Sequence, residues 1–505
     1  MRKNGILMHL SSLPGDTGIG TMGKEAYDFV DFLKKGGQSL WQLLPVVPTS
    51  YGDSPYSSPS TFAGNPYFID LDTLADEGLL EKAEYEDIDW GGDPEKVDYG
   101  LIYEKRFPVL RKAAKRLLEK RPEEFDRFVE KNADWLPDYA LFMALKDKNG
   151  GKPWLEWPEE EKNYSPETAK KLADELRDDV DFYMVLQYLF FRQWEKLRKY
   201  ANDRGIEIIG DLPIYVALDS ADAWSQPELF QLDEERRPKA VAGCPPDGFS
   251  ADGQLWGNPL YDWDYHKKTG YEWWLRRIGY LTELYNIVRI DHFRGFDSYY
   301  AIPYGAKTAK IGEWREGPGM DLFNVVKEKM PDSRIIAEDL GFLTDSVRKL
   351  LSDTGYPGMK ILQFAFDSRD SSSNEYLPFN YPKNCIAYTG THDNQTVRGW
   401  FESAPEQSVE FAKEYMRITD DDNEHWDMMQ VLMGSPADTA ILTAQDILGL
   451  DDSARMNTPS TVGCNWQWRA KKGAFTDELA EKLDKLTSMY GRKPAKAGVE
   501  AAEDE

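Results

Sequence analysis

Short apolar runs alternate with amphipathic helical patterns along most of this chain. Near-continuous runs rich in Ile, Leu and Val are typical of strands that are buried on both faces, and helices between them indicate parallel pairing. Eight such units predict an α/β fold. A (β/α)8 TIM barrel is the favoured architecture, and a doubly wound open sheet is the alternative. The predicted strands are residues 5–10, 40–44, 206–210, 287–290, 334–337, 359–365, 385–389 and 439–443.

The first predicted helix, residues 24–35, illustrates the helical pattern. Its apolar residues recur at positions i, i+3, i+4 and i+7, which lie on one face of a helix. The pair Gly36-Gly37 follows directly and is a typical helix stop. The residues on this face are Ala26, Phe29, Val30 and Leu33.

The spacing of the predicted strands is uneven. Roughly 160 residues separate the second run from the third, far more than an ordinary βα connection needs. We therefore expect one catalytic barrel over residues 1–490 that carries two inserted subdomains over its C-terminal face. The first insertion is residues 46–205, and the second, dense in Trp, Tyr, Pro and Gly, is residues 213–285. The Lys-, Ala- and Glu-rich residues 491–505 are predicted to form a flexible tail.

Composition and charge narrow the class of protein. The 88 acidic and 61 basic residues give a net charge of −27, which argues against nucleic acid or an anionic membrane as the main partner. Three widely spaced cysteines, Cys244, Cys385 and Cys464, fit a reducing compartment better than a disulfide framework. The apolar stretch near the N-terminus is too short for a signal peptide, so a cytoplasmic location is expected.

One glycine motif resembles a nucleotide-binding signature. Gly18, Gly20 and Gly23 match the G-x-G-x-x-G pattern and precede a predicted helix. Residues 11–17 separate the motif from the strand before it, whereas the dinucleotide fingerprint needs a tight strand-to-helix turn. We expect an irregular turn here and no cofactor. The five histidines do not cluster at metal-ligand spacing, so no catalytic metal is expected either.

Acidic residues follow four of the predicted strands. They are Asp211, Asp291, Glu338 and Asp393. The C-terminal strand ends of a β/α barrel form the floor of its active site, so these four carboxyl groups are expected to converge there. Any one of them could instead be a helix cap or a solvated loop residue, and the hypothesis of a shared function therefore rests on the set.

The immediate neighbours of these acids suggest different roles for them. Arg289 and Asp291 are two residues apart in a strand and therefore share a face, where the guanidinium would keep Asp291 ionised, as a nucleophile must be. Glu338 follows a purely apolar run, and burial would raise its pKa towards that of a general acid. Two carboxyl groups in opposite environments are the signature of glycoside chemistry.

Two Gly- and Pro-rich loops, residues 51–56 and 253–259, add aromatic and short polar side chains that could stack on and hydrogen-bond a sugar. With these motifs the chain resembles the 4-α-glucanotransferases, the amylomaltase or disproportionating-enzyme family (glycoside hydrolase family 77). The matching stretches are Gly52-Asp-Ser-Pro-Tyr-Ser-Ser, Phe62-Ala-Gly-Asn-Pro-Tyr, Gly210-Asp-Leu-Pro-Ile-Tyr, Gln254-Leu-Trp-Gly-Asn-Pro-Leu-Tyr, Val288-Arg-Ile-Asp-His-Phe-Arg-Gly, Ala337-Glu-Asp-Leu-Gly, Thr389-Gly-Thr-His-Asp-Asn and Asn465-Trp-Gln-Trp.

The resemblance implies retaining transfer of α-1,4-glucan segments to the 4-hydroxyl of a glucose or maltooligosaccharide acceptor, without a cofactor. It implies that Asp291 is the nucleophile, Glu338 the acid/base and Asp393 the acid that stabilises the transition state. Substrate-binding positions carried over in the same way are Tyr56, Tyr99, Asp211, Trp256, Arg289, His392 and Asn465.

Other functions stay open at this stage. A plain α-glucan hydrolase could use the same barrel, because water and sugar hydroxyls compete for one intermediate. A glucan-binding protein without catalysis and a nicotinamide-dependent oxidoreductase are further alternatives. The chain also departs from some relatives at Gly248, beside Phe249, where they carry an aromatic residue, so the preferred glucan length is not predicted.

Overall fold

A computed structural model describes residues 2–50, 52–246, 251–341, 343–368, 373–419 and 423–494. Eight parallel strands form one sheet in the order β10-β11-β12-β1-β2-β3-β6-β9. The Ala337 N–H donates to the Pro357 carbonyl at 3.0 Å, which links the two ends of this sheet and closes the barrel. All eight predicted strands are therefore confirmed, as β1 (Lys3–Leu7), β2 (Leu40–Gln42), β3 (Glu207–Leu212), β6 (Ile287–Ile290), β9 (Ile335–Ala337), β10 (Gly358–Ile361), β11 (Cys385–Tyr388) and β12 (Thr439–Thr443).

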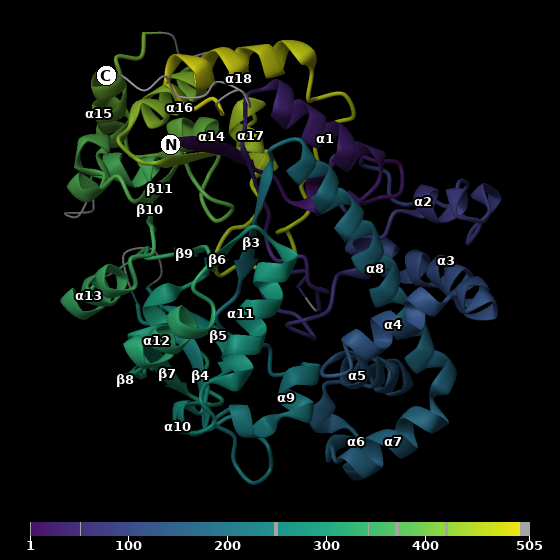
Figure 1. Cartoon of the computed structure of the whole chain (residues 1–505). Helices are drawn as coiled ribbons and strands as arrows, with labels where there is room; N and C mark the ends of the chain where they lie inside the picture. The colour runs from purple at the N-terminus through teal and green to yellow at the C-terminus, as the bar shows by residue number, and fades with distance from the viewer. Residues whose placement is uncertain are drawn as a thin grey trace, which may run out of the picture.

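Helices surround the barrel, as the alternating pattern predicted (Figure 1). Helix α1 (Lys24–Lys35) has the predicted bounds, and Gly37 after it adopts the left-handed conformation that ends the helix (φ 67°). The connection from β10 to β11 is different, since its described residues form only 3-10 turns. The remaining helices of this layer are α11 (Glu272–Leu284), α12 (Met320–Lys329), α13 (Asp345–Thr354), α14 (Val397–Ser403), α15 (Glu406–Met416), α16 (Glu424–Gly434), α17 (Ala444–Ile447) and α18 (Asp477–Met489).

The connection from β2 to β3 is a helical lobe, drawn in blue in Figure 1. Its last helix, α8, is the longest in the protein's described part and leads back to β3. Buried side chains of this lobe and of the barrel belong to one continuous core. The lobe contains α2 (Leu71–Asp76), α3 (Tyr99–Lys120), α4 (Glu123–Lys131), α5 (Leu136–Lys148), α6 (Glu159–Lys162), α7 (Pro166–Glu175) and α8 (Arg177–Asp203).

Two glutamines of α8 hold the lobe's first loop in place. Gln187 accepts from the Gly64 N–H at 2.7 Å and donates to the Gly64 carbonyl at 3.0 Å. Gln193 makes the same pair of bonds with the backbone of Asp70, at 2.7 and 3.1 Å. Both glutamines are buried, so their amides satisfy backbone groups that water cannot reach.

A second, antiparallel sheet of four strands in the order β5-β4-β7-β8 makes up the other insertion. Strands β4 (Ala240–Cys244) and β5 (Gln254–Pro259) lie in the predicted segment 213–285, with short helices α9 (Ala221–Ser225) and α10 (Trp263–Lys268). The other two strands, β7 (Ser298–Pro303) and β8 (Glu313–Glu316), follow β6 in the chain. The predicted segment 213–285 thus holds two of the four strands of this sheet. The last helix of that segment, α11, packs on barrel strands β3 and β6.

The end of the described chain is anchored to the barrel. Arg492, inside the predicted tail 491–505, is fully buried and donates to the carbonyls of Met433, Lys3 and Ala437 at 2.9 to 3.0 Å. Residues 491–494 are therefore part of the folded molecule, because a buried guanidinium must satisfy its donors internally. Residues 495–505 lie outside the described residues.

Candidate active site

The four predicted acids lie at the C-terminal end of the barrel. Asp211 is the next-to-last residue of β3, and Asp291 and Glu338 directly follow β6 and β9. Asp393 lies in the loop after β11. Strands β3, β6 and β9 are neighbours, and Asp211 stands opposite Arg289 in their register. Parallel strands that end side by side bring these side chains to one place, as predicted.

Arg289 joins two of these acids. Its Nη1 donates to both carboxylate oxygens of Asp211, at 2.8 and 2.6 Å, and its Nη2 lies 3.0 Å from Asp291 Oδ1. The Arg289 and Asp211 side chains are only 5% and 1% exposed. The prediction that Arg289 and Asp291 point the same way is confirmed. The guanidinium is fixed by a buried partner and cannot turn away from Asp291.

Glu338 is held by backbone groups rather than by a cation. Its Oε2 accepts from the His292 N–H at 2.7 Å, and its Oε1 accepts from the Leu340 N–H at 2.8 Å. His292 is left-handed (φ 49°), which turns the chain sharply just after Asp291. The Glu338 carboxylate therefore lies beside the residue that follows Asp291, and its orientation is fixed before substrate arrives.

The electrostatics differ in part from the prediction. Burial raises the pKa of Asp291 to about 8, against the lowering effect of Arg289. Burial also raises the pKa of Glu338, as predicted, and Arg289 and the two backbone donors oppose this effect. The prediction that Arg289 keeps Asp291 ionised did not consider dehydration and the nearby carboxylates. The two groups titrate as a coupled pair, and the proton belongs on Glu338 because Arg289 contacts Asp291 directly.

Asp393 and His392 form the opposite wall of the site. The His392 ring stacks on Tyr56, with centroids 5.2 Å apart and planes 14° apart, and its Nε2 lies 3.4 Å from Asp393 Oδ1. Burial lowers the pKa of His392, so the ring is neutral near pH 7. Asp393 Oδ1 also accepts from Asn457 Nδ2 at 2.6 Å, and the Asp393 side chain is 46% exposed.

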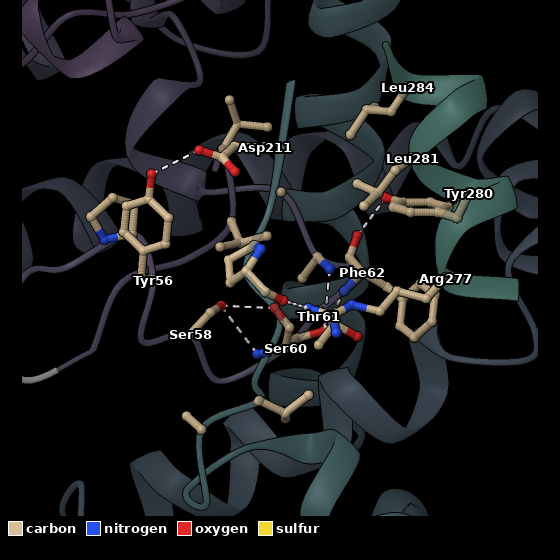
Figure 2. A pocket seen from close by; sticks show the side chains of 18 of the residues that line it. Tyr56, Ser58, Ser60, Thr61, Phe62, Asp211, Arg277, Tyr280, Leu281 and Leu284 are labelled. Atoms are coloured by element: carbon tan, nitrogen blue, oxygen red, sulfur yellow. Dashed lines mark hydrogen bonds between the residues drawn. The ribbon is translucent and has the colours of Figure 1, made fainter. Parts of the chain in front are cut away.

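Tyr56 connects this wall to the buried acids. Figure 2 shows its hydroxyl pointing at Asp211, to which it donates at 2.7 Å. Behind this bond lies a small, mainly apolar pocket of about 30 Å³ between the Tyr56 loop and α11. That volume suits about two water molecules. It is too small for a sugar.

The remaining predicted binding residues reach the site to different degrees. Trp256 is 37% exposed and meets the His292 ring edge-on at 4.8 Å, beside Asp291. Tyr99 is connected to the site through Trp466, whose carbonyl accepts from the Tyr99 hydroxyl at 2.9 Å. The Asn465 side chain is occupied within its own loop, where it accepts from the Thr458 N–H and donates to the Thr461 carbonyl.

Three residues of the site were missed by the sequence reasoning: Arg455, Asn457 and Trp466. The Trp466 ring packs against Tyr56 and His392, with centroids 5.9 and 5.8 Å away. Trp466 belongs to the quoted Asn465-Trp-Gln-Trp stretch, so a signal existed. Arg455 and Asn457 lie in the segment between α17 and α18, and only the folded chain brings them to Asp393.

The glycine motif near the N-terminus has a packing role. Gly18 is left-handed (φ 77°), and a Cβ on Gly20 would lie 1.9 Å from the Leu10 carbonyl oxygen. A Cβ on Gly23, the N-cap of α1, would collide with the Asp70 carboxylate. These close approaches account for the glycines without a nucleotide, in line with the predicted irregular turn.

Three further observations concern the described ranges only. They contain no group of three or more His, Cys, Asp or Glu side chains arranged to hold a metal ion. Their helices include none with the length and apolar character that a membrane span requires. Tyr51, Gly248 and Phe249, named in the sequence analysis, lie outside the described residues.

Comparison with known proteins gives consistent matches over nearly the whole chain. The sequence profile of a family described as 4-alpha-glucanotransferase matches residues 8–475. The 4-alpha-glucanotransferase of Clostridium butyricum is 53% identical over 96% of this chain and 100% of its own. That of Thermus thermophilus is 45% identical, over 97% of this chain and 99% of its own.

Solved structures agree with this. The amylomaltase of Streptococcus agalactiae, in complex with acarbose, superposes with a TM-score of 0.95 at 44% identity, over 98% of this chain and 100% of its own. The amylomaltase of Corynebacterium glutamicum, at 19% identity, shares the fold with a TM-score of 0.77, over 98% of this chain and 75% of its own.

Proposed function

The chain belongs to the 4-alpha-glucanotransferase family and transfers α-1,4-glucan segments, and from this premise we propose how its residues perform the transfer. The reaction is a retaining double displacement. Asp291 attacks the anomeric carbon of the donor glucan while Glu338 protonates the departing glycosidic oxygen. The old C–O bond breaks, the shortened glucan leaves with its new hydroxyl, and a glycosyl ester on Asp291 remains.

The second step reverses the first with a new partner. Glu338, now ionised, removes the proton from the 4-hydroxyl of an acceptor sugar, and the acceptor oxygen displaces Asp291 from the anomeric carbon. The new α-1,4 bond carries the configuration of the old one because two inversions occur. Glu338 ends protonated and Asp291 ionised, so the site is ready for another donor.

The observation that carries this proposal is the chain of contacts from the buried pair Asp211 and Arg289 to Asp291, beside Glu338. The guanidinium stabilises the charge on Asp291, and the proton that burial favours is left to Glu338. Asp211 offsets the charge of Arg289 and fixes its direction. Two carboxyl groups that differ in this way can serve as nucleophile and general acid.

Asp393, with its partly exposed carboxylate, stabilises the positive charge that develops on the sugar ring. Neutral His392 and Arg289 hold the glucose at the cleavage point. Tyr56 and Trp256 line the side where the acceptor arrives, and Tyr99 and Asn465 support that side through Trp466 and the loop before it. The expected donors and acceptors are α-1,4-glucans and maltooligosaccharides.

Transfer exceeds hydrolysis if an acceptor is held in line and water is kept out, since positioning can contribute about 7–11 kcal/mol. We assign this task to the two insertions, residues 46–205 and 213–285, on a catalytic barrel of residues 1–490. A cytoplasmic location is part of the proposal, because three widely spaced cysteines fit a compartment that keeps thiols reduced.

The test is incubation of the purified protein with maltotriose alone, with products and reducing ends followed over time. We expect glucose, a ladder of longer maltooligosaccharides and a constant number of reducing ends. A steady rise in reducing ends without longer chains would make the protein a hydrolase. Binding of maltotriose without turnover would make it a glucan-binding protein.

A further inference from the structure

The segment between α17 and α18 is hydrogen-bonded to the loop that carries Asp393. Three hydrogen bonds join them. The Asn457 N–H donates to the His392 carbonyl at 3.0 Å, Arg455 Nη2 donates to the Asp393 carbonyl at 2.6 Å, and Asn457 Nδ2 donates to Asp393 Oδ1 at 2.6 Å. Two of these bonds hold the backbone, and the third holds the carboxylate itself.

The third bond acts on one oxygen of Asp393 only. Oδ1 receives Asn457 and has the His392 ring nearby, whereas no hydrogen bond from the described residues reaches Oδ2. A carboxylate that is fixed at one oxygen can rotate little about its side-chain bonds. The direction of the other oxygen is therefore defined as well.

The chemical type of the donor matters as well. An amide orients Asp393 without neutralising its charge, whereas a cation in the same place would cancel the charge. The nearby cation does not take this place, because Arg455 binds two backbone carbonyls, those of Asp393 and Asn457, at 2.6 and 2.8 Å. The carboxylate thus keeps its full negative charge for the sugar.

The segment between α17 and α18 continues to the acceptor side. The Met456 carbonyl, between Arg455 and Asn457, accepts from the Trp466 N–H at 2.7 Å, and the Trp466 ring lies against Tyr56. The backbone that positions Asp393 therefore also supports the acceptor wall.

We propose that Asn457 is a positioning residue for the transfer reaction, which aims the Asp393 carboxylate at the charge that develops on the sugar ring. This inference rests on the role of Asp393 in the proposed function. The Asn457 side chain acts through Asp393.

The test uses the isosteric change Asn457→Asp. At pH 7 the new carboxylate cannot donate and repels Asp393, so kcat on maltotriose should fall about 100-fold while KM changes little, as expected when a reacting group is displaced by about 1 Å. Two carboxyl groups that share a site raise each other's pKa. As the pH falls towards 5, the new carboxyl therefore gains a proton and donates again. The ratio of wild-type to variant kcat should shrink about tenfold between pH 7 and pH 5.

Two variants control for charge and for folding. Asn394→Asp adds the same charge one residue from Asp393 but keeps the hydrogen bonds of that side chain, because Asn394 Oδ1 only accepts, from the Thr391 N–H and hydroxyl. It should keep kcat within about fivefold of the wild type and show no recovery at low pH. Asn457→Ala should lose kcat at every pH, and melting temperatures identify any variant that fails to fold.

Asp393→Asn, measured in parallel, separates this inference from the proposed function. If Asp393→Asn stays active, the role of Asp393 itself is wrong. If Asp393→Asn is inactive while folded Asn457→Asp and Asn457→Ala keep wild-type kcat, only the inference about Asn457 is overturned. A loss in Asn457→Asp that is the same at pH 7 and pH 5 would also overturn it, since a purely structural defect predicts that result.

Discussion

At the scale of single residues, the catalytic proposal depends on a guanidinium that cannot move. Arg289 is buried and binds Asp211 through two hydrogen bonds, and it contacts Asp291 with its second nitrogen. Breaking a buried ion pair by removing one partner is costly. Asp291 can be changed at a lower cost, because Arg289 keeps Asp211 as its partner.

The variant Asp291→Asn is expected to lose at least about 10⁴-fold in kcat, because the nucleophile is gone, and yet to be more stable at high pH. Burial favours a shared proton on the coupled Asp291–Glu338 pair, and a carboxyl pair whose pKa is raised by folding costs stability as the pH rises from about 4 towards the raised value. The neutral amide removes this cost. The melting temperature of Asp291→Asn should exceed that of the wild type by about 1–3 °C at pH 8 and by less at pH 5.

The matched control is Asp332→Asn, which removes a carboxylate at an exposed position. Its melting temperature should follow that of the wild type at both pH values. An Asp291→Asn variant whose advantage is equal at pH 5 and pH 8, or larger at pH 5, would contradict the raised pKa of Asp291.

Sequence reasoning reached these residues because strand ends and side-chain alternation are local properties. It predicted that Arg289 and Asp291 share a face and that Glu338 is buried. It did not predict the raised pKa of Asp291, which depends on carboxylates from neighbouring strands, or the contact of Asn457 with Asp393. Such contacts depend on loop paths, and no short-range pattern encodes them.

At the scale of elements, apolar runs and helix stops predicted all eight barrel strands and the bounds of α1. The second sheet was missed in part, because β7 and β8 follow a barrel strand and β7 pairs with β4, more than 50 residues earlier. The hydrophobic pattern reports local burial but not such a partner. The role of α8 was also hidden, since its two buried glutamines look like ordinary polar residues in the sequence.

The variant Gln187→Leu tests how α8 supports the active-site loop. Leucine fills the space but leaves the Gly64 N–H and carbonyl without their partner, which should lower the free energy of unfolding by about 2–4 kcal/mol. The same loop carries Tyr56, so KM for maltotriose should rise. Denaturant unfolding and initial rates measure the two effects.

Glu195→Leu is the control on the same helix, where the side chain is exposed. It should change the free energy of unfolding by about 0.5 kcal/mol or less. If Gln187→Leu lowers the free energy of unfolding no more than this control does, Gln187 does not stabilise the loop.

At the scale of the whole molecule, barrel and first insertion share one core, so the insertion is not an independent domain. The length of the β2–β3 connection predicted its existence, but only the structure shows that α8 leads back into the barrel wall. At the chain end, too, the structure adds a contact that the sequence did not predict. The composition of the chain end predicted a flexible tail from residue 491, whereas Arg492 binds it to β1 and to the segment between α16 and β12.

Arg492→Leu is expected to destabilise the whole protein. The loss of several hydrogen bonds to buried carbonyls, those of Met433, Lys3 and Ala437 among them, should cost about 3 kcal/mol or more. Calorimetry measures the change in the free energy of unfolding. Lys493→Leu, which removes only an exposed ion pair with Asp484, should cost no more than about 1 kcal/mol. Equal effects of the two variants would contradict an anchoring role for Arg492.

The central claim is that Asp291 forms a covalent glycosyl-enzyme and that Glu338 is needed to transfer the sugar onward. The most direct measurement uses the Glu338→Gln variant with an α-maltosyl fluoride donor, whose fluoride leaves without a general acid. Intact-protein and peptide mass spectrometry then follow the reaction. A maltosyl group is expected to accumulate on the peptide that contains Asp291 and to be absent from Glu338→Gln/Asp291→Asn. A maltosyl group on any other residue, or release of maltose with inverted configuration and no adduct, would contradict it.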